Sequence, residues 1–389
     1  MPSVFCERAI EEATKYGNAL LKFISPNDAG ETRSHQFGFY LPINAYRMFT
    51  PHPPIKGTKK KHWVKIEWQD ERETASVITW YGKKTRSEYR LTRFGRNFPF
   101  LNPDMVGNLL VLIPQTNAEF LAYVLDLEDD IEEIQTALGV EPFESWGIYR
   151  NGVAELETED ECIDRHFRQL AQSFTAFPKG IVFSDKARKA LVECVRKFQS
   201  KSADDVLLAS MEAEFRLFRI VERQVCQAEI VRIKKDVDDF LRTASTIMNR
   251  RKSRAGRSLE NHVEFLLKKA RIPFEMRPRI DGKPDVIIPN RRAYYDPEYP
   301  IDRLFVIGIK TTCKDRWRQV LNEGRRVPKK YLLTIQPGIS NNQLNEMKQA
   351  NIVLVVPQNL HKEYSPKRTV QLLTIEQFIT LVKIKLDIA

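Results

Sequence analysis

The chain has 389 residues, 42% of them hydrophobic, and a formal net charge of +11 with an isoelectric point near 9.3. At ~100–200 residues per domain this length predicts two or three domains, and the basic balance favours a polyanionic partner. Five scattered cysteines without a CxxC pair argue against a zinc site or a disulfide framework. Without an apolar run of about 18 residues or an N-terminal apolar segment, we expect a cytoplasmic protein with no membrane contact.

The first part of the chain, residues 1–150, is expected to be mostly β. Its candidate strands lie at 36–41, 63–68, 75–81, 109–113 and 119–124, separated by turn residues and basic loops. Many short strands at modest spacing are typical of a barrel or pseudobarrel.

The middle part, residues 151–240, is expected to be a mainly helical connector. No glycine or proline occurs between Gly180 and Gly256, and apolar residues recur at helical spacing, as in Val206, Met211, Phe215, Phe218 and Val225. We interpret this stripe as core packing, with the pairing of two subunits as the alternative.

The last part, residues 241–389, predicts strands that alternate with helices. A basic run at 249–257 precedes a helix expected to open at Ser258, and the last helix is expected to start at Thr374 with Gln377 completing a capping box. Strands are expected at 285–288, 304–309, 331–335 and 352–356. This alternation predicts an α/β sheet flanked by helices.

An acid and a lysine stand at the ends of two neighbouring apolar runs in this part. Asp285 opens the first run and Lys310 closes the second. An acid on one strand and a lysine on the next is the arrangement of a metal-dependent nuclease, in which carboxylates hold Mg²⁺ and the lysine polarises the attacking water. Glu260, Glu264 and Glu323, each expected on a helix, are further candidate acids. The alternative is a turn residue, a strand-end lysine and solvated helix faces.

The charged cluster after Lys310 contains side chains that read base edges. Arg316 and Arg318 can bond bidentately to guanine in the major groove, and Asp315 can accept from cytosine N4. Clamping of phosphates alone would need no acid. The alternative is a charged helix start with Trp317 buried.

The motifs around these residues resemble those of the EcoRII-like type II (type IIE) restriction endonucleases. The resemblance is close over about 240–389 and looser over 1–115. The sequence segments that carry it are Met248–Glu260, Lys283-Pro-Asp285, Lys310 through Glu323, Leu354–Pro357 and Leu360–Tyr364.

The resemblance implies a C-terminal PD-(D/E)XK nuclease domain, with the late acid of the motif moved onto a helix. Asp285, Lys310 and Glu323 would form the catalytic set, Glu260 would be an additional acid at the Mg²⁺, and Lys314 would be an auxiliary base. Asp315, Arg316 and Arg318 would read the C·G pairs of a CCWGG-like site in double-stranded DNA. The implied enzyme is a bacterial homodimer with one active site per strand.

The resemblance also implies that the N-terminal domain binds a second copy of the target as an effector, through a pseudobarrel like the B-three domain of plant transcription factors. In relatives this domain blocks the catalytic cleft until effector DNA binds. Two loops, 25–40 and 82–96, carry the match. The candidate DNA-binding residues are His35, Tyr40, Lys84, Arg86, Glu88, Tyr89, Arg90, Arg93 and Arg96. Tyr89 is a departure, because the family has a lysine there.

The sequence therefore predicts a site-specific DNA endonuclease with an effector domain at 1–150, a helical connector at 151–240 and a catalytic domain at 241–389. The first alternative is a DNA-binding regulator that does not cleave. The second is a repair or transposition nuclease without sequence preference. A structural RNA-binding protein ranks last, because aromatic stacking platforms are not evident.

Overall fold

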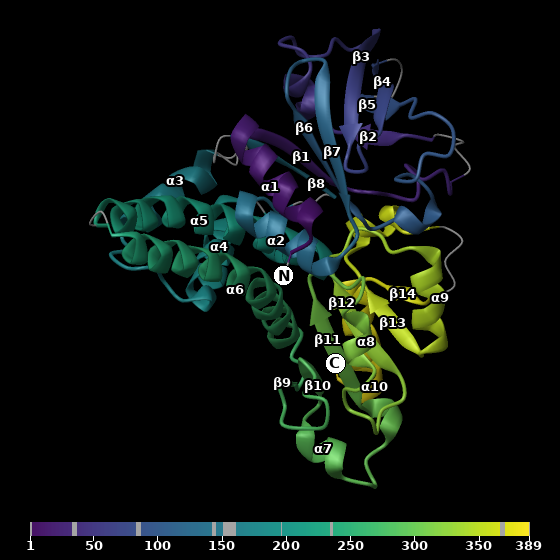
Figure 1. Cartoon of the computed structure of the whole chain (residues 1–389). Coiled ribbons are helices and arrows are strands. Elements are labelled where there is room, and N and C mark those ends of the chain that lie inside the picture. The colour runs from purple at the N-terminus through teal and green to yellow at the C-terminus, as the bar shows by residue number, and fades with distance from the viewer. Residues whose placement is uncertain are drawn as a thin grey trace. The chain divides into compact units, whose positions relative to one another are not determined.

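A computed structural model describes residues 2–32, 37–82, 87–141, 145–150, 161–195, 197–233, 236–365 and 370–388 (Figure 1). The chain divides into two compact units. The N-terminal unit contains Met1–Glu155 together with Gln336–Glu346 and Leu360–Thr369. The C-terminal unit contains Leu156–Ile335, Met347–Asn359 and Val370–Ala389. The helices that were expected to form a separate connector thus cluster with the second sheet.

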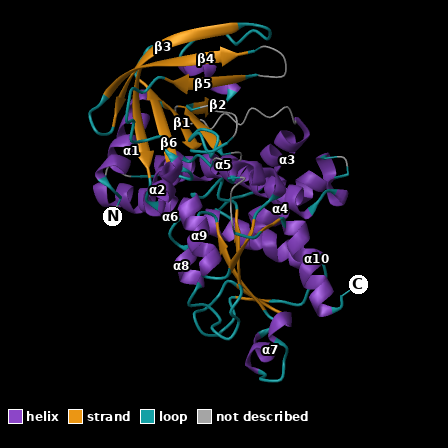
Figure 2. Ribbon diagram, turned by 90° about the vertical axis from the view of Figure 1, so that its right-hand side faces the viewer, coloured by secondary structure: helices purple, strands orange, loops and turns teal. Residues whose placement is uncertain are grey.

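The N-terminal unit is built on a curved eight-stranded sheet (Figure 2). The strand order is β2-β5-β4-β3-β7-β6-β1-β8, and the pair β3·β7 is parallel while the other pairs are antiparallel. Its strands are β1 (Asn18–Phe23), β2 (Phe39–Leu41), β3 (Lys59–Trp68), β4 (Glu73–Tyr81), β5 (Glu88–Thr92), β6 (Leu109–Pro114), β7 (Glu119–Leu125) and β8 (Trp146–Arg150). Its helices are α1 (Val4–Tyr16), η1 (Ile43–Met48), η2 (Pro103–Met105) and α2 (Glu128–Leu138). This architecture is the predicted pseudobarrel.

The two faces of this sheet are filled differently. Strand β3 alternates between buried and exposed side chains, and Val64, Ile66 and Trp68 enter an interior core rich in aromatic rings. Strand β1 is buried on both faces because helices α1 and α2 cover the outer one, with Ala9 and Ile134 among the residues in that second core. Side chains alternate between buried and exposed where one face of the sheet meets water, and they are buried on both faces where helices cover the sheet.

Four helices form the first part of the C-terminal unit: α3 (Glu161–Gln172), α4 (Gly180–Cys194), α5 (Ala203–Val231) and α6 (Val237–Lys269), with a short turn η3 (Phe198–Ser200). The prediction that a helix opens at Ser258 is wrong, since α6 begins at Val237 behind the cap residue Asp236 and Ser258 is buried inside it. The basic run before Ser258 belongs to this helix. Gly256 does not interrupt the helix, because one glycine within a helix lowers its stability by only ~1 kcal/mol relative to alanine. A Cβ at this position would meet nothing within 4 Å, so no close packing requires the glycine.

The sequence argued against a framework of disulfides, and the described part of the chain contains a single disulfide bond. Cys162 in α3 and Cys194 at the end of α4 are bonded, with their Cα atoms 5.7 Å apart. The spacing of cysteines along the chain did not indicate this pair, because the contact depends on how two helices pack. The other three cysteines, Cys6, Cys226 and Cys313, are buried and not part of a disulfide.

The second part of the C-terminal unit is a six-stranded mixed sheet in the order β14-β13-β12-β11-β10-β9. Strands β11 to β14 are parallel, whereas β10 and β9 are antiparallel additions at one edge. The strands are β9 (Glu275–Met276), β10 (Val286–Ile288), β11 (Phe305–Lys310), β12 (Lys330–Thr334), β13 (Ile352–Val355) and β14 (Leu372–Leu373). Between and after these strands, the chain forms α7 (Arg291–Tyr295), η4 (Ile301–Arg303), α8 (Trp317–Val320), α9 (Asn341–Gln349), η5 (Gln358–Glu363) and α10 (Ile375–Leu386). Most of α9 and of η5 belongs to the N-terminal unit.

This second sheet has the continuous apolar strands of a sheet that is covered on both faces. Strands β10, β12 and β13 are buried along their whole length, and β11 is buried up to its last residue, Lys310. Helix α10 starts behind Thr374 with the predicted capping box to Gln377. The predicted combination of a β pseudobarrel and an α/β domain is confirmed. Within the described residues, no helix has both the length and the apolar character needed to cross a membrane.

Candidate active site and DNA-binding loops

Asp285 lies immediately before β10, where three strands of the second sheet converge. Its Oδ2 accepts hydrogen bonds from the backbone N of Ile309, at 2.7 Å, and from Nζ of Lys310, at 2.9 Å. Its backbone carbonyl accepts from the N–H of Arg277, also at 2.7 Å. The antiparallel register of β10 with β11 thus places the acid beside the lysine that closes the next strand.

Lys310 and Asp285 form an ion pair whose side chains are each less than a fifth exposed. Lys310 is the first residue of β11 that is not fully buried, so its stem lies in the sheet while its ammonium group reaches the edge. A half-buried pair is less screened than a surface pair. The two predicted residues are therefore brought together as the sequence pattern indicated.

Glu323 provides a second carboxylate at this edge. Its side chain is only 6% exposed, and Oε2 is buried without a hydrogen-bond partner among the described residues. Burial and the neighbouring Asp285 carboxylate raise the pKa of Glu323 to about 7, against the lowering effect of Lys310 and Lys330. The carboxylates of Asp285 and Glu323 repel each other, and Oε2 of Glu323 has no hydrogen bond to any described residue. A cation bound here would offset the repulsion between the two carboxylates.

The expectation that Glu323 lies on a helix is wrong, because α8 is a single turn that ends at Val320. A loop ahead of Asp285 holds Glu323 instead. Asp281 accepts from the backbone N–H groups of Gly324 and Arg325, at 2.8 and 2.6 Å. Gly282 packs so closely that a Cβ there would stand 2.5 Å from the Cα of Glu323.

The two candidate acids of helix α6 differ in their surroundings. Glu260 is mostly buried and forms an ion pair with Arg277, which follows strand β9. Glu264 bonds Lys268 one turn further along the helix, at 2.6 Å. Glu264 therefore fits the solvated helix face, whereas Glu260 is linked through Arg277 to the strand end at Asp285.

The charged cluster after β11 forms a turn and the start of α8. Trp317 is buried, and the Arg318 guanidinium lies over its ring at 4.7 Å from the centroid. Arg318 is half exposed and pairs with Asp315 at 3.7 Å, while Lys314 and Arg316 are of intermediate exposure. A buried tryptophan and exposed charges occur together, so the two interpretations of this segment are compatible. The base contacts of these residues stay predictions.

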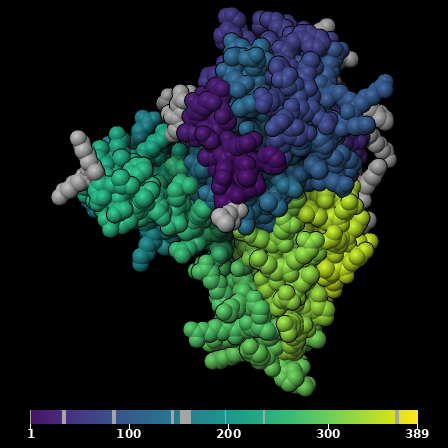
Figure 3. Space-filling view, viewed as in Figure 1, coloured from purple at the N-terminus to yellow at the C-terminus, as the bar shows by residue number. Residues whose placement is uncertain are grey.

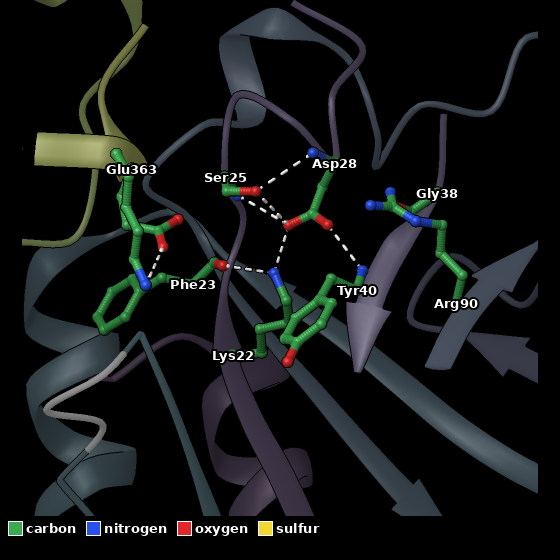
Figure 4. A network of polar contacts seen from close by, with 9 residues as sticks. Lys22, Phe23, Ser25, Asp28, Gly38, Tyr40, Arg90 and Glu363 are labelled. Atoms are coloured by element: carbon green, nitrogen blue, oxygen red, sulfur yellow. Dashed lines mark hydrogen bonds and ion pairs between the residues drawn. The ribbon is translucent and has the colours of Figure 1, made fainter. Parts of the chain in front are cut away.

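In the N-terminal unit, a buried polar network supports the first predicted DNA-binding loop, at 25–40, whose last residue, Tyr40, lies in strand β2 (Figure 4). Asp28 is fully buried, and its carboxylate accepts from Nζ of buried Lys22, from Ser25 Oγ at 2.8 Å and from the Tyr40 N–H at 2.7 Å. The backbone carbonyl of Asp28 accepts from the Gly38 N–H at 3.1 Å. One carboxylate thus ties together both stems of the loop. The predicted residues His35, Lys84 and Arg86 lie outside the described residues.

The described residues of the second predicted loop face different surroundings. Arg90 is 4% exposed and donates to the Gly38 carbonyl at 3.1 Å, which fits support of the first loop. Tyr89 is buried in the core against Phe49 and Trp80, so the position that departs from the family is a packing position here. Glu88 is partly exposed, and Arg93 and Arg96 are exposed. Their DNA contacts stay predictions.

Sequence reasoning missed several residues of these sites, among them Arg277, Lys330, Lys22 and Asp28. Lys330 is buried, and its Nζ donates to the carbonyls of Gly324 and Val327, which fixes the segment after Glu323. A lysine inside an otherwise apolar strand, as in Leu20-Leu-Lys22-Phe23, is a signal of a buried ion pair that the sequence did offer. Nothing in the sequence indicated Arg277.

An acid and a lysine paired at the edge of a mixed sheet, in a chain that also has a β pseudobarrel, indicate a nuclease, and comparisons with known proteins identify a restriction endonuclease. The family model for the EcoRII C-terminal domain matches residues 218–379, and the model for the N-terminal domain of restriction endonuclease EcoRII matches residues 13–146. Type II restriction enzyme EcoRII of Escherichia coli is 30% identical over 401 residues, which cover 97% of this chain and 96% of that one. The chain belongs to the EcoRII family of type II restriction enzymes, which are site-specific deoxyribonucleases.

Other similar proteins cover less of the chain. Type II restriction enzyme SsoII of Shigella sonnei is 28% identical over 142 residues, 33% of this chain and 45% of that one. Among solved structures, metal-depleted Ecl18kI in complex with uncleaved, modified DNA has a TM-score of 0.46 at 21% identity and covers 56% of this chain and 83% of its own. The complex of restriction endonuclease PspGI with substrate DNA has a TM-score of 0.45 at 17% identity and covers 54% and 94%.

Proposed function

We propose that this enzyme hydrolyses double-stranded DNA at a short CCWGG-like site in a Mg²⁺-dependent reaction, and that its N-terminal domain binds a second copy of the site as an effector. The observation that carries the cleavage chemistry is the Asp285–Lys310 pair beside the unsatisfied Glu323 carboxylate. We divide the chain into an effector domain at 1–150, a helical connector at 151–240 and a catalytic domain at 241–389.

The donor set at this edge fits a divalent cation. In the part of the chain that the structure describes, no three His, Cys, Asp or Glu side chains are already gathered as a ligand set. Mg²⁺ does not need such a cage, because it keeps several waters and binds one or two carboxylates with near-octahedral geometry. Asp285 and Glu323 would hold it with their oxygens, and Glu260 would be the additional acid. When bound, the ion neutralises phosphate charge and lowers the pKa of a bound water.

The remaining chemistry comes from side chains of the chain itself. Lys310, held in place by Asp285, would position the attacking water and the scissile phosphate for in-line displacement of the 3′ oxygen. Its positive charge lies where negative charge grows in the transition state. Lys314, in the turn that follows β11, would be a second positive charge near the scissile phosphate.

Sequence reading would come from the turn before α8. Asp315, Arg316 and Arg318 combine an acceptor for cytosine N4 with two bidentate donors for guanine. Each good bidentate contact is worth ~1–3 kcal/mol of discrimination. In the N-terminal domain, the candidates for effector binding are His35, Tyr40, Lys84, Arg86, Glu88, Arg90, Arg93 and Arg96, with Arg90 acting through the loop that it supports.

A palindromic duplex needs one active site per strand, so the functional enzyme would be a homodimer. The helical part of the C-terminal unit projects from its sheet as an arm, formed at its end by α5 and α6 (Figure 3). Large apolar side chains are at least half exposed near the end of α5 and the start of α6: Ile230, Val231, Val237, Phe240 and Leu241. Exposed apolar residues in such number favour a protein contact, and we propose that two chains meet there.

Cleavage of a fully sequenced plasmid tests the proposed function. The enzyme is incubated with Mg²⁺ or with EDTA, with and without an added oligonucleotide that carries the site, and fragment ends are mapped. Discrete ends at a CC/GG-flanked site, formed only with Mg²⁺ and lost in Asp285→Ala, support the proposal. Discrete ends elsewhere contradict the proposed site. A smear or an intact plasmid under all conditions contradicts site-specific cleavage.

A further inference from the structure

Arg277 links two of the acids of the candidate active site. It follows strand β9 with a left-handed backbone, at a φ of 47°, which side chains other than glycine rarely adopt. Its N–H donates to the Asp285 carbonyl at 2.7 Å, while its guanidinium pairs with Glu260 of helix α6. A strained backbone persists only where its surroundings determine it, and here the strand partner holds the backbone while the side chain reaches α6.

We propose that Arg277 is an internal counter-ion that occupies Glu260 in the DNA-free enzyme and releases it when DNA arrives. The inference rests on the proposed function, since it assigns a regulator to the same metal site. A guanidinium and a divalent cation compete for the same carboxylate oxygens, and a positive charge beside the site also repels the cation. While Lys310 holds Asp285 and Arg277 holds Glu260, one acid of the proposed Mg²⁺ pair and the additional acid are both engaged by cationic side chains.

The two partners differ in a way that suits such an exchange. The Glu260 side chain is 18% exposed and has little room to move, whereas the Arg277 side chain is 62% exposed. Arginine binds phosphate bidentately as readily as it binds carboxylate. A DNA phosphate brought to the strand edge therefore offers Arg277 a second partner, and its departure leaves the Glu260 oxygens to the cation. Metal affinity and DNA affinity would then rise together.

The test is Mn²⁺ binding to the full chain without DNA, followed by electron paramagnetic resonance of the free ion. Arg277→Gln should bind Mn²⁺ about fivefold more tightly than the wild type, or ~1 kcal/mol, whereas Arg277→Lys should stay close to the wild type. Arg291→Gln is the matched control, because Arg291 pairs with Glu275 of β9 at 3.6 Å and is similarly exposed. It should leave the affinity unchanged. Adding Glu260→Gln to Arg277→Gln should abolish the gain.

A phosphorothioate duplex that carries the mapped site provides the second arm. In its presence the affinities of the wild type and Arg277→Gln should converge to within about twofold. Equal or weaker Mn²⁺ binding by a folded Arg277→Gln chain without DNA overturns the inference, and so does a difference that DNA leaves intact. If Asp285→Ala binds Mn²⁺ as the wild type does, the proposed metal site itself fails, which separates the two outcomes.

Discussion

Gly282 offers the sharpest test of how the candidate active site is built. Its φ of 72° favours glycine, and a Cβ at this position would lie 2.2 Å from the carbonyl oxygen of Asn322 and 2.5 Å from the Cα of Glu323. Both obstacles are backbone atoms, so they cannot rotate away. The left-handed conformation costs an L-residue ~1–2 kcal/mol, and forced displacement of a packed segment costs ~1–3 kcal/mol. Gly282→Ala should therefore lose about 2–5 kcal/mol of stability and misplace Glu323.

Gly57→Ala separates the two contributions. Gly57 also has a left-handed φ, of 89°, but a Cβ there would meet nothing within 4 Å. It should therefore lose only the ~1–2 kcal/mol of backbone strain and keep cleavage. The assays are urea unfolding followed by circular dichroism, and the rate of plasmid cleavage under Mg²⁺. Equal unfolding midpoints and equal cleavage rates in the two variants would refute the close approach on which this reasoning depends.

Three further predictions concern charge and assembly. Because the pKa of Glu323 is raised to about 7, the folded state holds this proton more tightly than the unfolded one; its stabilising contribution is complete below about pH 4.5 and declines as the pH rises to 7. Glu323→Gln should flatten that decline in unfolding measured from pH 4.5 to 8, and an unchanged slope would argue against it. Asp28→Asn should destabilise the N-terminal unit by ~3–5 kcal/mol, because it leaves Lys22 buried without its counter-ion, and it should weaken binding of a labelled target duplex. Adding Lys22→Met should recover part of the lost melting temperature. An Asp28→Asn variant as stable as the wild type would contradict the ion pair. Phe240→Glu with Leu241→Glu should halve the mass found by light scattering while the circular dichroism spectrum of the folded chain is kept, whereas an unchanged mass would place the dimer contact elsewhere.

The sequence predicted that Asp285 and Lys310 lie together because that information is local. Asp285 opens one apolar run and Lys310 closes the next, and the antiparallel pairing of the two strands brings these residues side by side. Glu323 was identified as an acid of the site by resemblance, but its surroundings were not predicted. Its position depends on the loop at Asp281, which is distant along the chain, and on the burial of Lys330, which holds the Gly324 and Val327 carbonyls.

The errors in the helices have a related cause. The expected start at Ser258 assumed that this serine caps the helix. Serine also occurs inside continuous helices, as Ser258 does here, so the residue type alone does not locate the first turn. The basic residues before it were interpreted as a separate run, yet several of them contact helix α5. Arg250 pairs with Glu229 and Arg251 with Glu222, at 2.7 Å each. Charge counted along the chain does not distinguish a solvated run from one face of a packed helix.

Helix α6 spans 33 residues without a break. The apolar side chain of Phe240 lies near its first turn, and Glu260 lies about 20 residues further on, a separation of ~30 Å at 1.5 Å per residue. A protein contact at the first end of the helix is therefore rigidly connected to Glu260. The length of this helix would fix the distance between the proposed dimer contact and the candidate active site of each subunit. A deletion of one residue between the two positions would shorten this distance by ~1.5 Å and turn Glu260 by ~100° about the helix axis, away from the strand edge.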